Sequence, residues 1–296
     1  MLITMLYIIT LLMVDFMSDD KEEVKRRLEG LFHVKSIEEQ INRNLSEVKY
    51  KIGVISGKGG VGKSTVTANM AVALALKGSK VAIFDSDFHG PSIPKMLGVM
   101  DRELMVTKDR KIIPIEGPLG IKVISIAYFL PDKTEAVIWR GPLKKKFFDD
   151  LAMYTQWGKL DYLLFDLPPG TGDEALNLAQ SIRDVTGVIA VTQPTEVSAL
   201  AVAKSLNFAK KVNIRVLGVI ENMSYFICGD GKKYKIFHGE GGELLSKEFE
   251  IPILGKIPID PRVAEYGDSG YSLLMEDPDS EFSKVFFRIV DQLSKL

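Results

Sequence analysis

The chain has 296 residues, a formal net charge of −1, and a composition of 46% hydrophobic and 26% charged residues. This length suffices for one large α/β domain, or two modest ones, with a substantial core. The near-neutral charge excludes bulk attraction to nucleic acid or anionic membranes, so we expect neither as a partner. The single cysteine, Cys228, excludes an internal disulfide and predicts a reducing, cytoplasmic location.

Residues 1–17, MLITMLYIITLLMVDFM, form an apolar N-terminal extension. The apolar run over residues 1–14 is shorter than the roughly 20 residues that a membrane-spanning helix needs. It also lacks the basic start and the small-residue cleavage site of a signal peptide. We interpret Met17 as the start of translation, which makes the extension a start-site artefact. An N-terminal membrane anchor is the alternative interpretation.

Residues 18–48 form a charged segment whose apolar residues recur at helical spacing, which predicts one or two surface helices. These apolar residues are Val24, Leu28, Leu31, Ile37, Ile41 and Leu45. The remaining residues, 49–296, are predicted to form the main domain.

Short β-branched runs alternate with helical patterns along this main domain. The predicted strands are 50–56, 80–85, 121–126, 161–166, 187–192 and 214–220, and the predicted helices are 63–77, 143–157, 173–183 and 196–211. Near-continuous apolar strands separated by helices indicate a mainly parallel sheet with helices on both faces, a three-layer α/β fold. The stretches 98–120 and 225–242 are predicted to be irregular insertions.

A glycine-rich loop, VISGKGGVGKST over residues 54–65, follows the first predicted strand and opens a helix. It fits the phosphate-binding pattern G-x-x-x-x-G-K-[ST] in the required context, so 49–296 is predicted to be a P-loop ATPase domain. The backbone N–H groups and the positive helix end suit phosphate oxygens. Lys63 is expected to reach the β- and γ-phosphates of ATP and Ser64 to ligate Mg²⁺. The predicted nucleotide-binding residues of the loop are Gly57, Lys58, Gly59, Gly60, Val61, Gly62, Lys63, Ser64 and Thr65.

Three carboxylates follow two predicted strands, in VAIFDSD and YLLFDLPPGTGD. Because ligands bind at the carboxyl ends of parallel strands, these acids are expected to converge on the phosphate loop. Asp166 suits holding Mg²⁺, Asp87 suits orienting the attacking water, and Asp85 suits supporting the metal shell. Capping of the next turn is the alternative role for Asp85.

The loop carries a second lysine, Lys58, and KGGVGKST resembles the deviant Walker A motif of the MinD/ParA-like ATPases. In that family the extra lysine reaches the partner's phosphates across a nucleotide-sandwich dimer. The resemblance therefore implies an ATP-bound homodimer in which Lys58 is a catalytic residue supplied in trans. A solvated lysine beside a glycine turn is the alternative.

Five further blocks occur in order and together resemble the Mrp/ApbC group of iron–sulfur cluster carrier ATPases. They are DSDFHGPSIPKMLG (85–98), VIWRGPLKKK (137–146), WGKLDYLLFDLPPGTGDE (157–174), VTQPTEVSAL (191–200) and GVIENMSYF (218–226). The resemblance covers residues 50–270. It implies slow ATP hydrolysis coupled to handing a cluster to apo iron–sulfur proteins or receiving it from assembly scaffold proteins. It also implies that Asn222 lies near the adenine base.

The sequence departs from this group at the cluster site. Carriers usually place C-x-x-C just after the Asn-Met-Ser block, whereas here Cys228 is followed by Gly231 at the second position. A dimer then supplies two thiolates, while [4Fe–4S] clusters ordinarily take four. The remaining ligands of a bridging cluster are expected from His238, Asp230, a small thiol or a partner protein. Alternatively, Cys228 is a packed small hydrophobe.

Two functions compete with the carrier. The first is a positioning or regulatory switch of the MinD/ParA type without a cluster, cycling on a membrane or on DNA. The second is a scaffold that binds nucleotide without hydrolysing it, which the intact P-loop and acids argue against. The C-terminal segment bears on the membrane alternative because Phe282, Phe286, Ile289 and Leu293 recur at helical spacing. Its polar side mixes acidic and basic residues, so we expect it to pack on its own domain.

Overall fold

The computed structural model describes residues 35–88, 90–130, 141–170 and 173–295. The chain divides into two compact units, residues 1–40 and 41–296, and the account below concerns the second. The apolar extension and most of the predicted helical segment lie outside the described residues. The boundaries proposed from the sequence, at residues 17 and 48, stay predictions.

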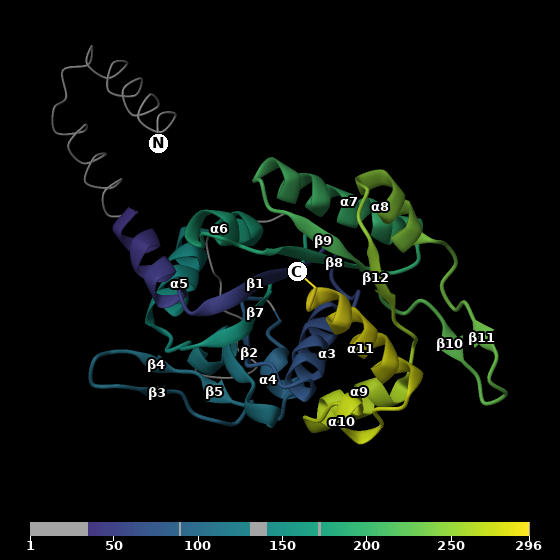
Figure 1. The fold of residues 1–296 in the computed structure, drawn as a ribbon, viewed down its shortest axis with the longest axis horizontal. Coiled ribbons are helices and arrows are strands. Elements are labelled where there is room, and N and C mark those ends of the chain that lie inside the picture. The colour runs from purple at the N-terminus through teal and green to yellow at the C-terminus, as the bar shows by residue number, and fades with distance from the viewer. Residues whose placement is uncertain (1–34, 89, 131–140, 171–172, 296) are drawn as a thin grey trace, which may run out of the picture. The chain divides into compact units, whose positions relative to one another are not determined.

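The centre of the second unit is an eight-stranded sheet with the order β12-β9-β8-β1-β7-β2-β6-β5 (Figure 1). Its strands are β1 (Val48–Ser56), β2 (Val81–Asp85), β5 (Ile115–Glu116), β6 (Lys122–Ser125), β7 (Leu160–Asp166), β8 (Gly187–Thr192), β9 (Val216–Glu221) and β12 (Ile253–Lys256). All neighbours pair in parallel except β5, which is antiparallel to β6. The mainly parallel sheet is confirmed, and the six predicted strands each match one of these.

Helices cover both faces of the sheet, as expected for a three-layer P-loop fold. Figure 1 shows α3, α4, α9, α10 and α11 on one face and α5, α6, α7 and α8 on the other. Their bounds are α3 (Lys63–Leu76), α4 (Ile93–Met96), α5 (Gly141–Tyr154), α6 (Asp173–Ser181), α7 (Glu196–Lys211), α8 (Gly241–Phe249), α9 (Pro261–Ser269), α10 (Leu273–Glu276) and α11 (Glu281–Leu293). Short 3₁₀ turns occupy Pro118–Gly120 and Ile126–Phe129.

The two halves of the core follow from the alternation of side chains along each strand. On β2, Ile83 belongs to the apolar cluster that includes Met70 of α3 and Phe286 of α11. Its neighbour Phe84 faces the opposite way, and its ring stacks on Phe148 of α5 with centroids 4.9 Å apart. A strand buried on both faces needs apolar residues at successive positions, which is why these strands appear as continuous apolar runs.

The C-terminal helix α11 packs on its own domain, as predicted. Phe282, Phe286, Ile289 and Leu293 are all buried, and the helix lies against α3 and β12. Its apolar stripe is therefore already covered within the unit. Among the described residues, no helix is long and apolar enough to cross a membrane.

The two predicted irregular insertions each contain a short antiparallel pair that the sequence did not indicate. Strands β3 (Met105–Val106) and β4 (Ile112–Ile113) pair in the first, and β10 (Phe226–Ile227) and β11 (Lys233–Tyr234) pair in the second. Figure 1 shows the β10–β11 hairpin projecting at the edge of the second unit, beyond α11. This hairpin carries Cys228.

Candidate nucleotide-binding site

The phosphate loop joins the carboxyl end of β1 to the first turn of α3, and its glycines have structural reasons. Gly60 and Gly62 have φ angles of 78° and 82°, in the left-handed region that favours glycine. Gly57 meets a different constraint, because a Cβ there would lie 2.1 Å from the backbone carbon of Ala201. The loop therefore packs closely against the backbone of α7 at Ala201, and its glycines suit the turning of N–H groups toward an anion.

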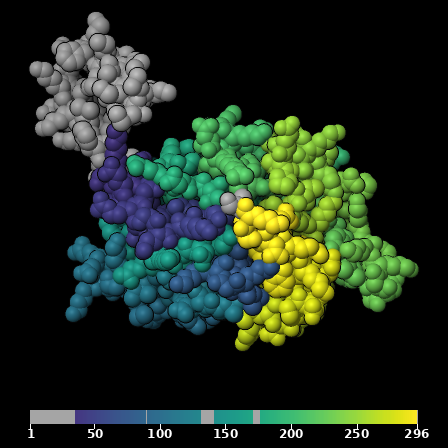
Figure 2. Space-filling view, viewed as in Figure 1, coloured from purple at the N-terminus to yellow at the C-terminus, as the bar shows by residue number. Residues whose placement is uncertain are grey.

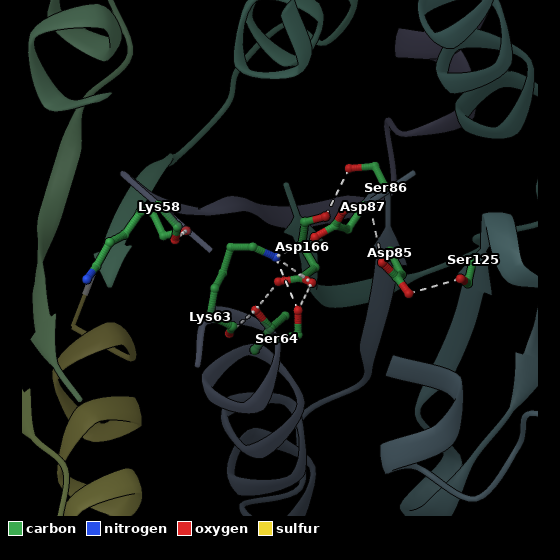
Figure 3. Close-up of polar contacts among 10 residues, drawn as sticks. Lys58, Lys63, Ser64, Asp85, Ser86, Asp87, Ser125 and Asp166 are labelled. Atoms are coloured by element: carbon green, nitrogen blue, oxygen red, sulfur yellow. Dashed lines mark hydrogen bonds and ion pairs between the residues drawn. The ribbon is translucent and has the colours of Figure 1, made fainter. Parts of the chain in front are cut away.

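Lys63 lies at the centre of a compact polar cluster (Figure 3). Its Nζ is 2.7 Å from Asp166 Oδ2 and 3.8 Å from Asp87 Oδ2, and it donates a hydrogen bond to Ser64 Oγ at 3.2 Å. Only 5% of the Lys63 side chain is exposed. A buried ammonium is stable when carboxylates pair with it, and Asp166 provides that pairing here.

The Asp166 carboxylate accepts hydrogen bonds at both oxygens. Ser64 Oγ donates to Oδ2 at 2.6 Å, and Thr67 Oγ1 donates to Oδ1 at 2.7 Å. Sequence reasoning missed Thr67, although it follows Lys63 by four residues and therefore lies on the same face of α3. A serine hydroxyl and a carboxylate in contact are hard oxygen donors, so Ser64 and Asp166 suit Mg²⁺.

The structure separates the roles available to Asp85 and Asp87. Asp87 belongs to the Lys63 cluster, whereas Asp85 is fully buried and accepts a hydrogen bond from Ser125 Oγ of β6 at 2.9 Å. Burial, followed by the nearby Asp166 carboxylate, raises the pKa of Asp85 to about 8. Asp85 lies opposite Asp166 on the neighbouring strand, and the backbone N–H of Asp87 donates to its Oδ1 at 3.3 Å.

Lys58 does not join this cluster. Figure 3 shows its side chain pointing away from Lys63 and Asp166, and it is half-buried. Its backbone carbonyl accepts a hydrogen bond from Ser56 Oγ at 3.1 Å, which fixes the start of the loop. Lys58 is thus part of the phosphate loop, but its ammonium group is directed away from the Lys63 cluster, and its role in trans stays a prediction.

Two neighbouring cavities lie along the loop. The first, of about 250 Å³, is lined mainly by the loop and Asp87, and we call it the phosphate cavity. The second, of about 330 Å³, lies between α3, α4 and α9, and we call it the side pocket. They share the lining residues Gly62, Thr65, Ser92 and Met96. The two cavities together have the form of a site for an anionic group joined to a larger apolar one.

Asn222 stands at the junction between the loop and the side pocket. Its Nδ2 donates to the Val61 carbonyl at 2.8 Å, and a Cβ at Gly62 would lie 2.2 Å from that nitrogen. Another part of the pocket wall is the segment 258–260, which follows β12. Sequence reasoning missed this wall because β12 is a four-residue edge strand, too short to be recognised from its pattern.

The β10–β11 hairpin presents Cys228 at its turn. Cys228 N donates to the Lys232 carbonyl at 3.0 Å, and Gly231 N donates to the Cys228 carbonyl at 2.9 Å. Gly231 has a φ of 79°, so the residue at the expected second cysteine position is the left-handed glycine of the turn. Cys228 is exposed, which argues against the interpretation of a packed small hydrophobe.

The other predicted cluster ligands are not gathered around Cys228. Asp230 accepts a hydrogen bond from Lys232 N at 3.0 Å, and His238 is exposed further along the loop. Over residues 35–88, 90–130, 141–170 and 173–295, no three His, Cys, Asp or Glu side chains form a group that could hold a metal ion. The described part of one protomer therefore offers Cys228 as a single exposed thiol.

Comparison with known proteins places the whole second unit among related sequences. Residues 47–294 match the family model ParA, described as NUBPL iron-transfer P-loop NTPase. The chain is 49% identical over 265 residues to the iron–sulfur cluster carrier protein of Saccharolobus solfataricus, covering 89% of each chain. It is 48% identical over 257 residues to the carrier protein of Methanocaldococcus jannaschii, covering 86% of this chain and 88% of the other.

A solved structure resembles the fold as a whole. A nucleotide-binding protein of Archaeoglobus fulgidus in complex with ADP superposes with a TM-score of 0.72 and 35% sequence identity. The match covers 84% of this chain and 96% of that protein. The likeness therefore extends over the sheet, the phosphate loop and the helices that line both cavities.

Proposed function

Because the chain belongs to the family of ParA/NUBPL iron-transfer P-loop NTPases, we propose that it is an ATP-hydrolysing iron–sulfur cluster carrier. The observation that carries the proposal is the contact of Lys63, Ser64 and Asp166 at the mouth of the glycine loop. A buried lysine, a hydroxyl and a carboxylate beside loop N–H groups are the parts that P-loop phosphoryl transfer uses. The relatives named as iron–sulfur cluster carrier proteins support the proposal that the cargo is an iron–sulfur cluster.

The phosphates of ATP fit the phosphate cavity. Ser64 and Asp166 are the residues that would hold Mg²⁺, which neutralises charge on the phosphate oxygens when bound. Lys63 moves its ammonium from Asp166 toward the β- and γ-phosphates. Asp87, whose Oδ2 lies 3.8 Å from Lys63 Nζ, orients the water that attacks the γ-phosphorus. The bond to the bridging oxygen breaks, and ADP and phosphate result.

The adenine base fits the side pocket, which shares four lining residues with the phosphate cavity. Its walls are largely apolar, and the Asn222 amide lies at its junction with the loop. An apolar pocket with a few placed polar groups suits a purine, because ring burial supplies affinity and the amide supplies orientation. The related protein of Archaeoglobus fulgidus, solved in complex with ADP, supports a nucleotide as the ligand.

A homodimer completes the active form. Lys58 is directed away from its own cluster, which leaves its ammonium available to the phosphates of a second copy. Two protomers also contribute two Cys228 thiolates to a bridging cluster carried as cargo. The remaining ligands come from the apo iron–sulfur protein, the scaffold protein or a small thiol. A lone thiol that must stay reduced fits a cytoplasmic location.

The hairpin favours one alternative function. Gly231 occupies the position of the second cysteine and has the positive φ of a turn glycine. The conformation of this turn therefore suits a glycine rather than a cysteine at that position. A nucleotide-dependent switch of the MinD/ParA type without a cluster is therefore the second candidate.

Iron and acid-labile sulfide per protomer, measured after anaerobic reconstitution, separate these functions. The wild type and Cys228→Ala are compared, with ADP affinity as the control that the variant is folded. A stoichiometric cluster that is lost in Cys228→Ala supports the carrier. A wild type that hydrolyses ATP but binds no iron supports the switch, and a wild type that hydrolyses no ATP contradicts both.

A further inference from the structure

The side pocket shares a wall with a third cavity under the Cys228 hairpin. This cavity, of about 400 Å³, is lined by Phe226, Ile227 and Glu281, among others. Four residues line both spaces: Pro258, Ile259, Asp260 and Phe282. A single layer of side chains therefore separates the candidate base site from the root of the hairpin. In Figure 2 the hairpin lies at the right-hand edge, beside the yellow C-terminal helices.

The chain that leads from the pocket to Cys228 is bonded to this shared wall. Ser224 N donates to the Ile257 carbonyl at 2.9 Å, and Ile259 N donates to the Tyr225 carbonyl at 2.7 Å. Phe226 then forms a parallel bridge with Ile259. Residues 257–259 are thus joined by backbone hydrogen bonds to the segment that enters the hairpin.

The same chain begins in a strained conformation at the pocket. Met223 has a φ of 56°, in the left-handed region that a residue with a Cβ rarely adopts. Its Sδ accepts a contact from Gln193 Nε2 at 3.3 Å, and that amide also lies 3.5 Å from the Gly60 carbonyl of the phosphate loop. Gln193 therefore links Met223, three residues before the hairpin, to the phosphate loop.

Glu281, the first residue of α11, fastens the hairpin from outside. Its Oε1 accepts a hydrogen bond from Tyr225 Oη at 3.0 Å and lies 3.5 Å from Lys233 Nζ and 3.6 Å from the Arg288 guanidinium. Lys233 also lies over the Tyr225 ring, 4.4 Å from its centroid. Glu281 thus contacts Lys233 of β11 and Tyr225, the residue just before β10, while the next residue, Phe282, lines the side pocket.

We propose that occupancy of the side pocket sets the position of the Cys228 hairpin through two attachments. One is Ile259, and the other is the start of α11 at Glu281 and Phe282, with Glu281 as a positioning residue. A base packed against Ile259 and Phe282 restricts both attachments of the hairpin at once. Nucleotide binding and thiol presentation are then linked, so each must affect the other by the same factor. This inference rests on the proposed nucleotide site and adds the regulation of the cargo thiol.

The single cysteine makes a direct test available, because a nitroxide label attaches only at Cys228. The mobility of the label is measured by electron paramagnetic resonance with and without Mg²⁺ and ADP. Calorimetry gives ADP affinity, and sedimentation confirms that ADP leaves the oligomeric state unchanged. Cys228 lines none of the three cavities, so a change in label mobility reports transmission rather than contact.

Three variants sharpen the test. Glu281→Gln removes the charge that holds the hairpin, and Tyr225→Phe removes only the hydroxyl that donates a hydrogen bond to Glu281. Asp279→Asn is the matched control, because Asp279 lies two residues away, is 94% exposed and pairs with Lys284 instead. Saturating ADP should reduce label mobility in the wild type and in Asp279→Asn. The reduction should fall by at least about half in Glu281→Gln and in Tyr225→Phe, and Glu281→Gln should weaken ADP binding about fivefold.

Two results overturn the inference. One is a wild-type label whose mobility is unchanged although calorimetry shows that ADP binds. The other is a Glu281→Gln variant with wild-type ADP affinity and a wild-type response of the label. Failure of the wild type to bind ADP at all contradicts the proposed nucleotide site. It then also contradicts the coupling between that site and the hairpin.

Discussion

The phosphate loop and the Cys228 hairpin differ in how completely one protomer builds them. Around Lys63, the loop, α3, β2 and β7 place every charged group against a partner within a buried cluster. Cys228 lies exposed in a turn between two strands of two residues each. A preorganised electrostatic site gives its full effect without rearrangement, whereas an exposed thiol depends on what approaches it. The nucleotide site is therefore complete in its own chain apart from Lys58, and the cargo site is not.

We expect the largest loss of ATP hydrolysis from a substitution of Lys63, at the centre of the phosphate site. Lys63→Ala removes the cation that pairs with Asp166 and that reaches the phosphates, so ATP hydrolysis should fall by about 10³-fold or more. Steady-state phosphate release measures the effect. Lys77→Ala is the control, because Lys77 pairs with Asp291 on the surface. Hydrolysis within tenfold of the wild type in Lys63→Ala would contradict the assignment of Lys63.

Asp87→Asn tests the water-orienting role with a smaller change. The amide keeps the shape of the side chain but is a weaker acceptor for a water proton, so hydrolysis should fall by about 10²-fold. Affinity for ADP should stay within a factor of about two, since product contains no attacking water. Single-turnover hydrolysis and calorimetry measure the two quantities. Equal losses in both would show that Asp87 serves binding instead.

Lys58→Ala asks whether the nucleotide site needs a second copy. Because Lys58 is directed away from its own cluster, ADP binding by one protomer should be unchanged. Hydrolysis should fall at least about tenfold, the effect expected of losing one charge supplied in trans. The wild-type specific activity should rise with protein concentration, and that rise should disappear in the variant. A variant with normal activity at every concentration would exclude the role in trans.

The smallest expected effect lies in the hairpin. Gly231→Ala places a Cβ on a residue with a φ of 79°, which should destabilise the turn by roughly 1–2 kcal/mol. Amide hydrogen exchange over residues 226–234 should accelerate, while ATP hydrolysis stays at the wild-type rate. Gly229→Ala is the matched control, because Gly229 has open space around it and no positive φ. Identical exchange in the two variants would contradict the turn assignment.

Much of the fold and of the phosphate cavity could be predicted because each depends on local pattern. The six predicted strands and four predicted helices are present, and Asp166 and Asp87 meet Lys63 at the carboxyl edge as expected. The site was predicted less completely where a residue acts from another element. Thr67 on Asp166 and the wall at 258–260 carry no motif, because packing rather than spacing brings them to the site.

The sequence by itself determined the phosphate loop, the parallel sheet and the loss of the second cysteine. Each follows from residues that are close together in the sequence, through their backbone preferences and the periodicity of their side chains. Only the tertiary structure decided that Lys58 is directed away from its own site and that Gly231 is the turn glycine of a hairpin. It alone also placed Ile259 and Phe282 between the side pocket and Cys228, because contacts between distant segments depend on how the layers pack.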